Sequence, residues 1–255
     1  MTDSPTSAPE GARVLADLRS LGGFHTLAGP LPAGSDAVPW PEVLAPGPLG
    51  ARFAAVRASL AAGSGMQPHQ VDPRVAVSAT QMGLASRLWS SALAAVVLHG
   101  WVPDLSTPNL VASPVHRGSV PLGLRDASAG RAVGSAGEAA AAILDVVVRS
   151  SLRDLHAACA EVGSTAPKVL VSNSASALTG AARVLAAARP DRAGTARELE
   201  RLLLADREVA AGGAHRPAGT FLRSGCCLFY RIPEHGLCPD CVLAPAHPER
   251  VTEPH

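Results

Sequence analysis

The chain has 255 residues, 22 of them Lys or Arg and 21 Asp or Glu, and its formal net charge is +1. A near-neutral chain with no run of basic residues and few, scattered aromatic side chains lacks the electrostatic and stacking features of nucleic-acid binders, so we expect no nucleic-acid partner. Its length suffices to bury a core without help from a metal.

Targeting signals are not expected. Residues 1–11 are polar and contain neither the basic nor the apolar region of a secretory signal. The longest apolar stretches are residues 92–98, which are too short to span a bilayer, and residues 139–148, which contain Asp145. We therefore predict no transmembrane segment and a cytoplasmic protein, with peripheral association at a membrane left open.

Helical patterns begin the chain. Apolar residues recur on one helical face over residues 14–21 and end at Gly22, and the Pro- and Gly-rich stretch that follows, up to Pro48, is expected to be loop or linker. Asp72 as a cap and Pro73 at the first helical position then predict a helix that continues to about residue 99.

The middle of the chain mixes strands and helices. Four prolines within residues 101–125 exclude a long helix, and two short runs at 110–112 and 119–124 predict a small β-hairpin. A capping box formed by Ser135 and Glu138 predicts a helix over about 135–161.

Two more helices are expected before the C-terminal region. One runs from about Ser172 to residue 188, with Ser172 or Asn173 as its cap, and a second capping box at Thr195 and Glu198 begins the other. The predicted fold is mainly α: a helical body with a small β-hairpin and a C-terminal cysteine-rich module. We divide the chain into an N-terminal helix and linker (1–71), a helical body (72–213) and a cysteine module with a tail (214–255).

Four of the five cysteines lie close together near the C-terminus, as C-C-x10-C-x2-C. In a reducing compartment such spacing indicates metal ligands or a redox centre more than disulfides. Turn residues at 233–236, after a short strand expected over 228–232, bring the two pairs together. Adjacent cysteines point to opposite sides of an extended chain, so a two-iron cluster suits them better than a single zinc ion, although zinc remains an alternative. The four are Cys226, Cys227, Cys238 and Cys241.

The segment GCCLFYR at 225–231, followed by CPDC at 238–241, resembles the C-terminal signature of the FhuF-type ferric-siderophore reductases. Two body segments resemble this family less specifically. The first is RLWSSA at 87–92, followed by Gly100 and by PDL at 103–105. The second is NSASAL at 173–178, which is similar to a Gly-Asn-x-x-Ser-Ala helix that the family shares with siderophore synthetases. Val171-Ser172 departs from the Trp-Gly that is common before this Asn.

The resemblance implies a 2Fe-2S cluster held by the four cysteines and one-electron reduction of the Fe(III) in a ferric siderophore, with release of Fe(II). The sequence has no nucleotide-binding glycine motif, so electrons are expected from an external ferredoxin, flavoprotein or small reductant. Arg223 and Arg231 flank the first cysteine pair and are candidates for tuning its charge or for docking an anionic siderophore or donor, or else are solvated surface residues.

Two other classes of function remain open: an iron–sulfur redox sensor that controls a partner, and a zinc module that is only structural. No hydrolase motif is present. The remaining candidates receive structural interpretations: Trp89 and Cys159 as core residues, Asn173 as a helix cap, His235 as a turn residue, and His99 and His116 as caps or surface groups.

Overall fold

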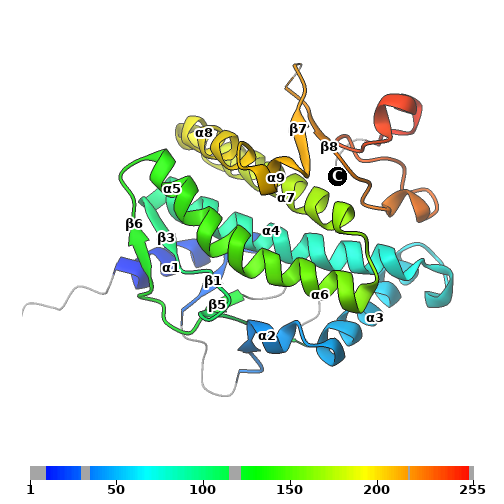
Figure 1. Ribbon diagram of the computed structural model, residues 1–255, viewed down its shortest axis with the longest axis horizontal. Helices are drawn as coiled ribbons and strands as arrows, with labels where there is room; N and C mark the ends of the chain where they lie inside the picture. Colours follow the sequence, from blue (N-terminus) through cyan, green and yellow to red (C-terminus); the bar gives the residue numbers. More distant parts are fainter. Residues whose placement is uncertain (1–9, 30–34, 115–121, 218, 253–255) are drawn as a thin grey trace, which may run out of the picture.

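The computed structural model describes residues 10–29, 35–114, 122–217 and 219–252. Two long helices, α4 (Pro73–His99) and α7 (Pro167–Ala188), pack along each other at the centre, and the other helices surround them (Figure 1). Small strand pairs lie at the edges of this helical body, and the cysteine-containing segment lies over one end of α7. The predicted mainly helical fold is confirmed.

Helix α4 has the predicted caps. The Asp72 side chain accepts a hydrogen bond from the Arg74 amide, and the helix ends at Gly100 in the left-handed conformation, with φ of 62°. Small residues recur throughout α4 and let other helices approach it on most sides. Trp89, which lies on α4, is 1% exposed, so its interpretation as a core residue is confirmed.

Helix α7 begins earlier than predicted. Ala166 is its N-cap residue and Pro167 occupies the first helical turn, where the missing amide of proline costs nothing. Ser172 and Asn173 therefore lie inside the helix, and the prediction that one of them caps it is wrong. Both side chains are fully buried.

The helix predicted over 135–161 is present but changes its winding. It consists of α5 (Ala136–Ile143), a π-helical stretch (Leu144–Leu152) and α6 (Arg153–Gly163). Ser135 caps it by accepting from the Glu138 amide. Cys159 on α6 is fully buried, and burial raises the pKa of its thiol to about 12, as suits the core residue predicted.

Helix α8 (Ala193–Leu204) begins before Thr195, so the second capping box is wrong. Glu198 instead forms an ion pair with Arg201 one turn along the helix. The short α9 (Arg207–Ala210) follows and leads to the strands β7 (Gly213–His215) and β8 (Phe221–Arg223), which pair antiparallel.

The stretch predicted as a linker is largely structured. After α1 (Glu10–Leu21) come β1 (Leu27–Ala28), β2 (Val38–Pro39), α2 (Trp40–Val43) and α3 (Pro46–Gly63). Trp40 and Leu49 are completely buried, and they fix this segment against the helical body. Local Pro and Gly signals do not reveal such long-range packing.

The predicted hairpin is confirmed in its pairing. Strands β4 (Leu110–Ala112) and β5 (Leu122–Leu124) are antiparallel, with Leu110 opposite Leu124, while residues 115–121 between them, which include His116, lie outside the described residues. They form the centre of a four-stranded sheet in the order β1-β5-β4-β2, and a separate pair joins β3 (Trp101–Pro103) to β6 (Gly130–Ala132).

Short 3-10 helices connect several of these elements. They are η1 (Gly23–His25), η2 (Pro68–Gln70), η4 (Pro190–Arg192), η5 (Phe229–Arg231), η6 (Ala244–Ala246) and η7 (Pro248–Arg250).

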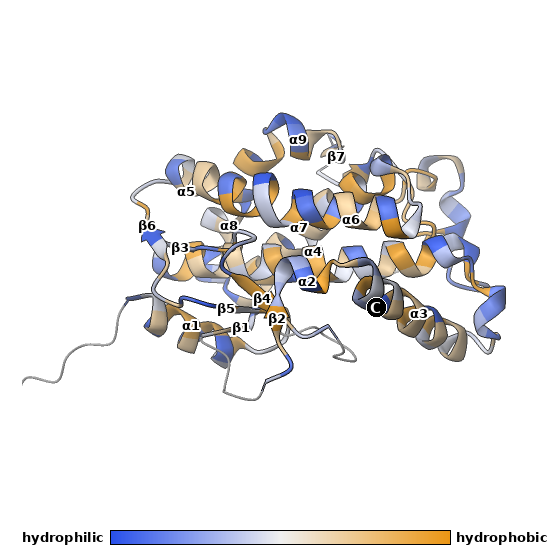
Figure 2. Ribbon diagram, turned by 60° about the horizontal axis from the view of Figure 1, so that its bottom comes forward, coloured by the Kyte–Doolittle hydropathy of each residue, from blue (hydrophilic) through white to orange (hydrophobic). Residues whose placement is uncertain are grey.

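Apolar residues gather where the helices face one another, and polar residues cover the outer faces, as the hydropathy colouring in Figure 2 shows. A second, smaller cluster joins the end of α3 and the start of α4 to the cysteine segment, through Ala61, Val71, Val75 and Ile232. Among the described helices, none is both long and apolar enough to cross a membrane.

Candidate metal centre

The chain enters the cysteine segment from β8, which is fixed against α7. The Ser224 amide donates to the Gly212 carbonyl at 2.9 Å, and its hydroxyl donates to the Ala211 carbonyl at 2.6 Å. Ser172 on α7 is hydrogen-bonded to the same hydroxyl at 2.9 Å. These contacts fix the position from which the first cysteine pair leaves the helical body.

Gly225 then passes so close to α7 that a side chain would not fit. A Cβ atom there would lie 2.9 Å from both the Lys168 carbonyl oxygen and Ser172 Oγ. The backbone of α7 cannot yield to it, because Lys168 is part of the helical hydrogen-bond ladder.

We expect Gly225→Ala to displace Cys226 and to lower the iron bound per chain by at least half, measured on protein purified under anaerobic conditions. Gly180→Ala is a matched control, since it lies on α7 with nothing within 4 Å of the added Cβ, and it should keep the wild-type iron content. Equal iron content in the two variants would contradict this reading of the close approach.

The first cysteine pair is followed by a tight turn. Leu228 adopts the left-handed conformation, with φ of 70°, and residues 229–231 form η5, so the strand predicted over 228–232 is wrong. This turn aims backbone amides at sulfur: Leu228 donates to Cys226 Sγ at 3.3 Å, and Phe229 donates to Cys227. Such N–H···S bonds stabilise thiolate ligands.

The second pair has a similar arrangement. The Cys241 amide donates to the Cys238 carbonyl at 2.9 Å, which closes the C-P-D-C turn, and the Leu243 amide donates to Cys241 Sγ at 3.4 Å. The two pairs, residues 226–227 and 238–241, are called the first and second cysteine arms below.

The two arms converge at Cys227. Hydrogen bonds from the Cys226 and Cys238 thiols lower the pKa of Cys227, and the same bonds raise the pKa values of Cys226 and Cys238. All four cysteines are free thiols. Cys227 and Cys241 are 3% and 2% exposed, whereas Cys226 and Cys238 are partly exposed, so one edge of the group faces solvent. Across the part of the chain that the structure describes, no three His, Cys, Asp or Glu side chains are already placed to hold one metal ion.

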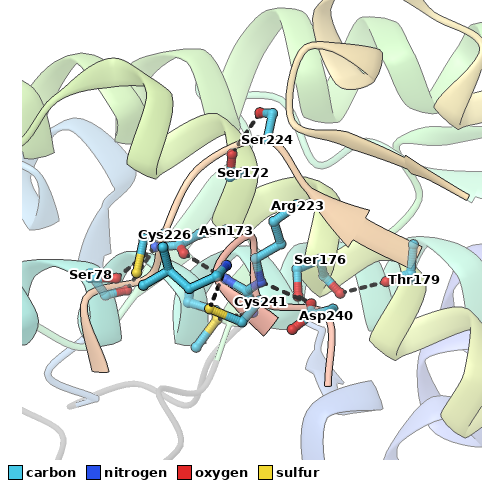
Figure 3. A network of polar contacts seen from close by, with 12 residues as sticks. Ser78, Ser172, Asn173, Ser176, Thr179, Arg223, Ser224, Cys226, Asp240 and Cys241 are labelled. Atoms are coloured by element: carbon cyan, nitrogen blue, oxygen red, sulfur yellow. Dashed lines mark hydrogen bonds and ion pairs between the residues drawn. The ribbon is translucent and has the colours of Figure 1, made fainter. Parts of the chain in front are cut away.

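A buried arginine links the second arm to the helical body (Figure 3). The Arg223 side chain is 4% exposed, and its Nε donates to Asp240 Oδ2 at 2.8 Å, with Asp240 lying between the two cysteines of that arm. Asp240 also accepts from the Ser176 hydroxyl, and its carbonyl accepts from the Arg223 amide at 3.0 Å. Burial argues against the docking and solvated roles considered for Arg223, and its position beside the thiols favours tuning their charge.

Arg231 lies at the surface, with its side chain 34% exposed, and forms an ion pair with Asp72 at the start of α4. Hydrogen bonds from Arg74, and more weakly from Arg231, lower the pKa of Asp72 to about 2. His235 packs its ring 5.1 Å from that of Phe229, in the turn between the arms, as a turn residue would.

A separate cavity of about 280 Å³ lies on another face of α7, and its lining combines Trp89, His156 and Ser174 with the charged Arg153 and Glu208 and with apolar side chains. Burial lowers the pKa of His156 to about 4, and this ring is hydrogen-bonded to Ser174 at 2.8 Å. None of the cysteines lines this cavity.

The comparisons with known proteins agree with the cysteine spacing. Residues 223–243 match the family model described as FhuF 2Fe-2S C-terminal domain, which confirms the resemblance to the FhuF type and supports a 2Fe-2S cluster as the cofactor. The search of curated proteins finds no match to this chain.

The residues present fit such a cluster. Four free thiols lie on two arms that converge, backbone amides are hydrogen-bonded to three of the sulfurs, and a buried guanidinium stands beside them. A cysteine binds a cluster iron as its thiolate, and the positive charge of Arg223 favours the thiolate form of Cys227. The sequence predicts the four cysteines as ligands, but it did not predict the buried polar network beneath them.

Proposed function

We propose that this protein is a ferric-siderophore reductase whose 2Fe-2S cluster is held by Cys226, Cys227, Cys238 and Cys241. The observation that carries the proposal is the convergence of the two cysteine arms at an edge that is partly open to solvent. The family match over residues 223–243 supports the cofactor, and the substrate is our inference.

The cluster, when bound, accepts and returns one electron at a time. The hard oxygen ligands of a siderophore hold Fe(III) far more tightly than Fe(II), so one electron added to the substrate releases its iron as Fe(II). That electron comes from a donor outside the chain, such as a ferredoxin, a flavoprotein or a small reductant.

The buried and the partly exposed cysteines have different roles in this proposal. Cys227 and Cys241, which are buried, anchor the centre in the fold, while Cys226 and Cys238 bring its other edge to solvent, where a bulky siderophore can approach. A substrate of that size does not need the 280 Å³ cavity, which lies away from the cysteines. Of the two arginines Arg223 and Arg231, only Arg231 has a side chain that is accessible to an anionic siderophore or donor.

The test is anaerobic turnover. Protein, a chemical reductant that reduces ferric siderophores slowly by itself, and a ferric hydroxamate or catecholate siderophore are mixed, and Fe(II) is trapped by a chromogenic chelator. We expect many Fe(II) per wild-type chain and a background rate for Cys227→Ser. A coloured, reducible protein that leaves every siderophore at the background rate would favour the redox sensor, and a colourless protein containing zinc would favour the structural module.

A further inference from the structure

Asn173 occupies a position where an apolar residue would be expected. It lies in the second turn of α7, is 0% exposed, and faces α4 across the helix pair at the centre of the fold. A buried amide is costly unless its hydrogen bonds are made, and here both ends of the amide have partners.

The amide nitrogen leads to the first cysteine arm. Asn173 Nδ2 donates to Ser78 Oγ at 2.9 Å and to the Ser78 carbonyl at 3.3 Å. The Ser78 hydroxyl in turn donates to the Cys227 carbonyl at 2.7 Å. A single serine of α4 therefore joins Asn173 to the backbone of a proposed ligand.

The amide oxygen leads to the second cysteine arm. Asn173 Oδ1 accepts from Arg223 Nη1 at 2.9 Å, and Arg223 binds Asp240, which lies between Cys238 and Cys241 (Figure 3). The orientation of the amide is fixed, because a guanidinium only donates and a carbonyl only accepts. One side chain in the helical core thus reaches each arm through one intermediate residue.

We propose that Asn173 is a positioning residue for the metal centre. By holding Ser78 and Arg223 at a fixed separation, it sets the spacing of the two cysteine arms and so determines how tightly the cluster is held and at what potential it is reduced. The inference rests on the cysteine ligation in the proposed function and not on the identity of the substrate.

The experiment measures iron retention and redox properties of the holoprotein. Asn173→Leu removes both branches, and Ser78→Ala removes the branch to Cys227 alone. Ser174→Ala is the matched control, because Ser174 is the next residue of α7, is buried, and is hydrogen-bonded to Gln81 and His156 with no link to either arm. Circular dichroism first establishes that each variant is folded.

We expect Asn173→Leu, which breaks both branches, to lose iron to an excess of a chelator about tenfold faster than wild type, a change that corresponds to about 1.4 kcal/mol. Its midpoint potential and reduced-state electron paramagnetic resonance spectrum should change as well. Ser78→Ala should change the rate of iron loss, the midpoint potential and the spectrum in the same direction by a smaller amount. Ser174→Ala should leave these three quantities at wild-type values.

Iron loss, potential and spectrum at wild-type values in folded Asn173→Leu would overturn the inference. Equal changes in Asn173→Leu and Ser174→Ala would also overturn it, because they would indicate general loosening of α7. If Asn173→Leu does not fold, Ser78→Ala decides by the same measurements. Wild-type protein that holds its cluster but reduces no siderophore would contradict the proposed function and leave this test unaffected.

Discussion

Replacing Cys227 with serine is expected to abolish or strongly alter the visible absorption of the bound cluster, while the helical body stays folded. Cys227 is the point at which the two arms meet, it is 3% exposed, and a serine hydroxyl does not supply the thiolate that an iron–sulfur cluster requires. Iron content, acid-labile sulfide and the visible spectrum measure the loss, and far-ultraviolet circular dichroism checks the fold.

Cys159 provides the matched control. It is the fifth cysteine, and it is fully buried in the main hydrophobic core on α6, outside the two cysteine arms. Cys159→Ala should retain the full iron content with a modest loss of stability. An unchanged spectrum in Cys227→Ser, or a bleached one in Cys159→Ala, would remove the ligand assignment.

Arg223→Met is expected to lower the free energy of unfolding by about 3 kcal/mol, because it leaves the Asp240 carboxylate and the Asn173 amide oxygen without their buried partner. Urea denaturation followed by circular dichroism measures this change. The double variant Arg223→Met with Asp240→Asn should recover part of the loss, since the unpaired charge is then gone.

Arg201→Met is the matched control for this prediction. Arg201 pairs with Glu198 on the exposed face of α8, with side chains 65% and 47% exposed, and such a pair contributes less than about 1 kcal/mol. Equal losses for Arg223→Met and Arg201→Met would mean that the buried ion pair does not stabilise the cysteine segment.

The parts of this fold that sequence predicts well are those with local chemical signals. Asp72 and Pro73 begin α4 and Gly100 ends it, because caps act on the nearest turn of backbone. The spacing of the four cysteines is likewise local, and the family match covers that segment.

The errors arise where distant parts of the chain decide the structure. Residues 22–48 are rich in Pro and Gly, yet β1 pairs with β5 and β2 with β4, both of them far away in sequence. Residues 228–232 have strand-forming side chains, but Leu228 takes a left-handed conformation that brings its amide to Cys226.

The missed part of the candidate site has the same cause. Asparagine is a residue type that often caps helices, so the sequence suggests this role for Asn173. Only the packing of α7 against α4 shows that its side-chain amide lies between Ser78 and Arg223. Arg223 likewise reads as a surface residue until the fold buries it under the second cysteine arm. The sequence signal for a buried polar network of this kind is a polar residue, such as Asn173, at a position where the apolar pattern of a helix would place an apolar residue.

The most direct test of the central claim is a single-turnover experiment on anaerobically purified wild-type protein. The protein is reduced with dithionite, the excess reductant is removed, and a ferric siderophore is added in the presence of an Fe(II) chelator while the electron paramagnetic resonance signal is recorded. We predict a reduced 2Fe-2S signal that disappears as one Fe(II) is trapped for each centre oxidised. A signal that persists while no Fe(II) is released would contradict the assignment of this protein as a ferric-siderophore reductase.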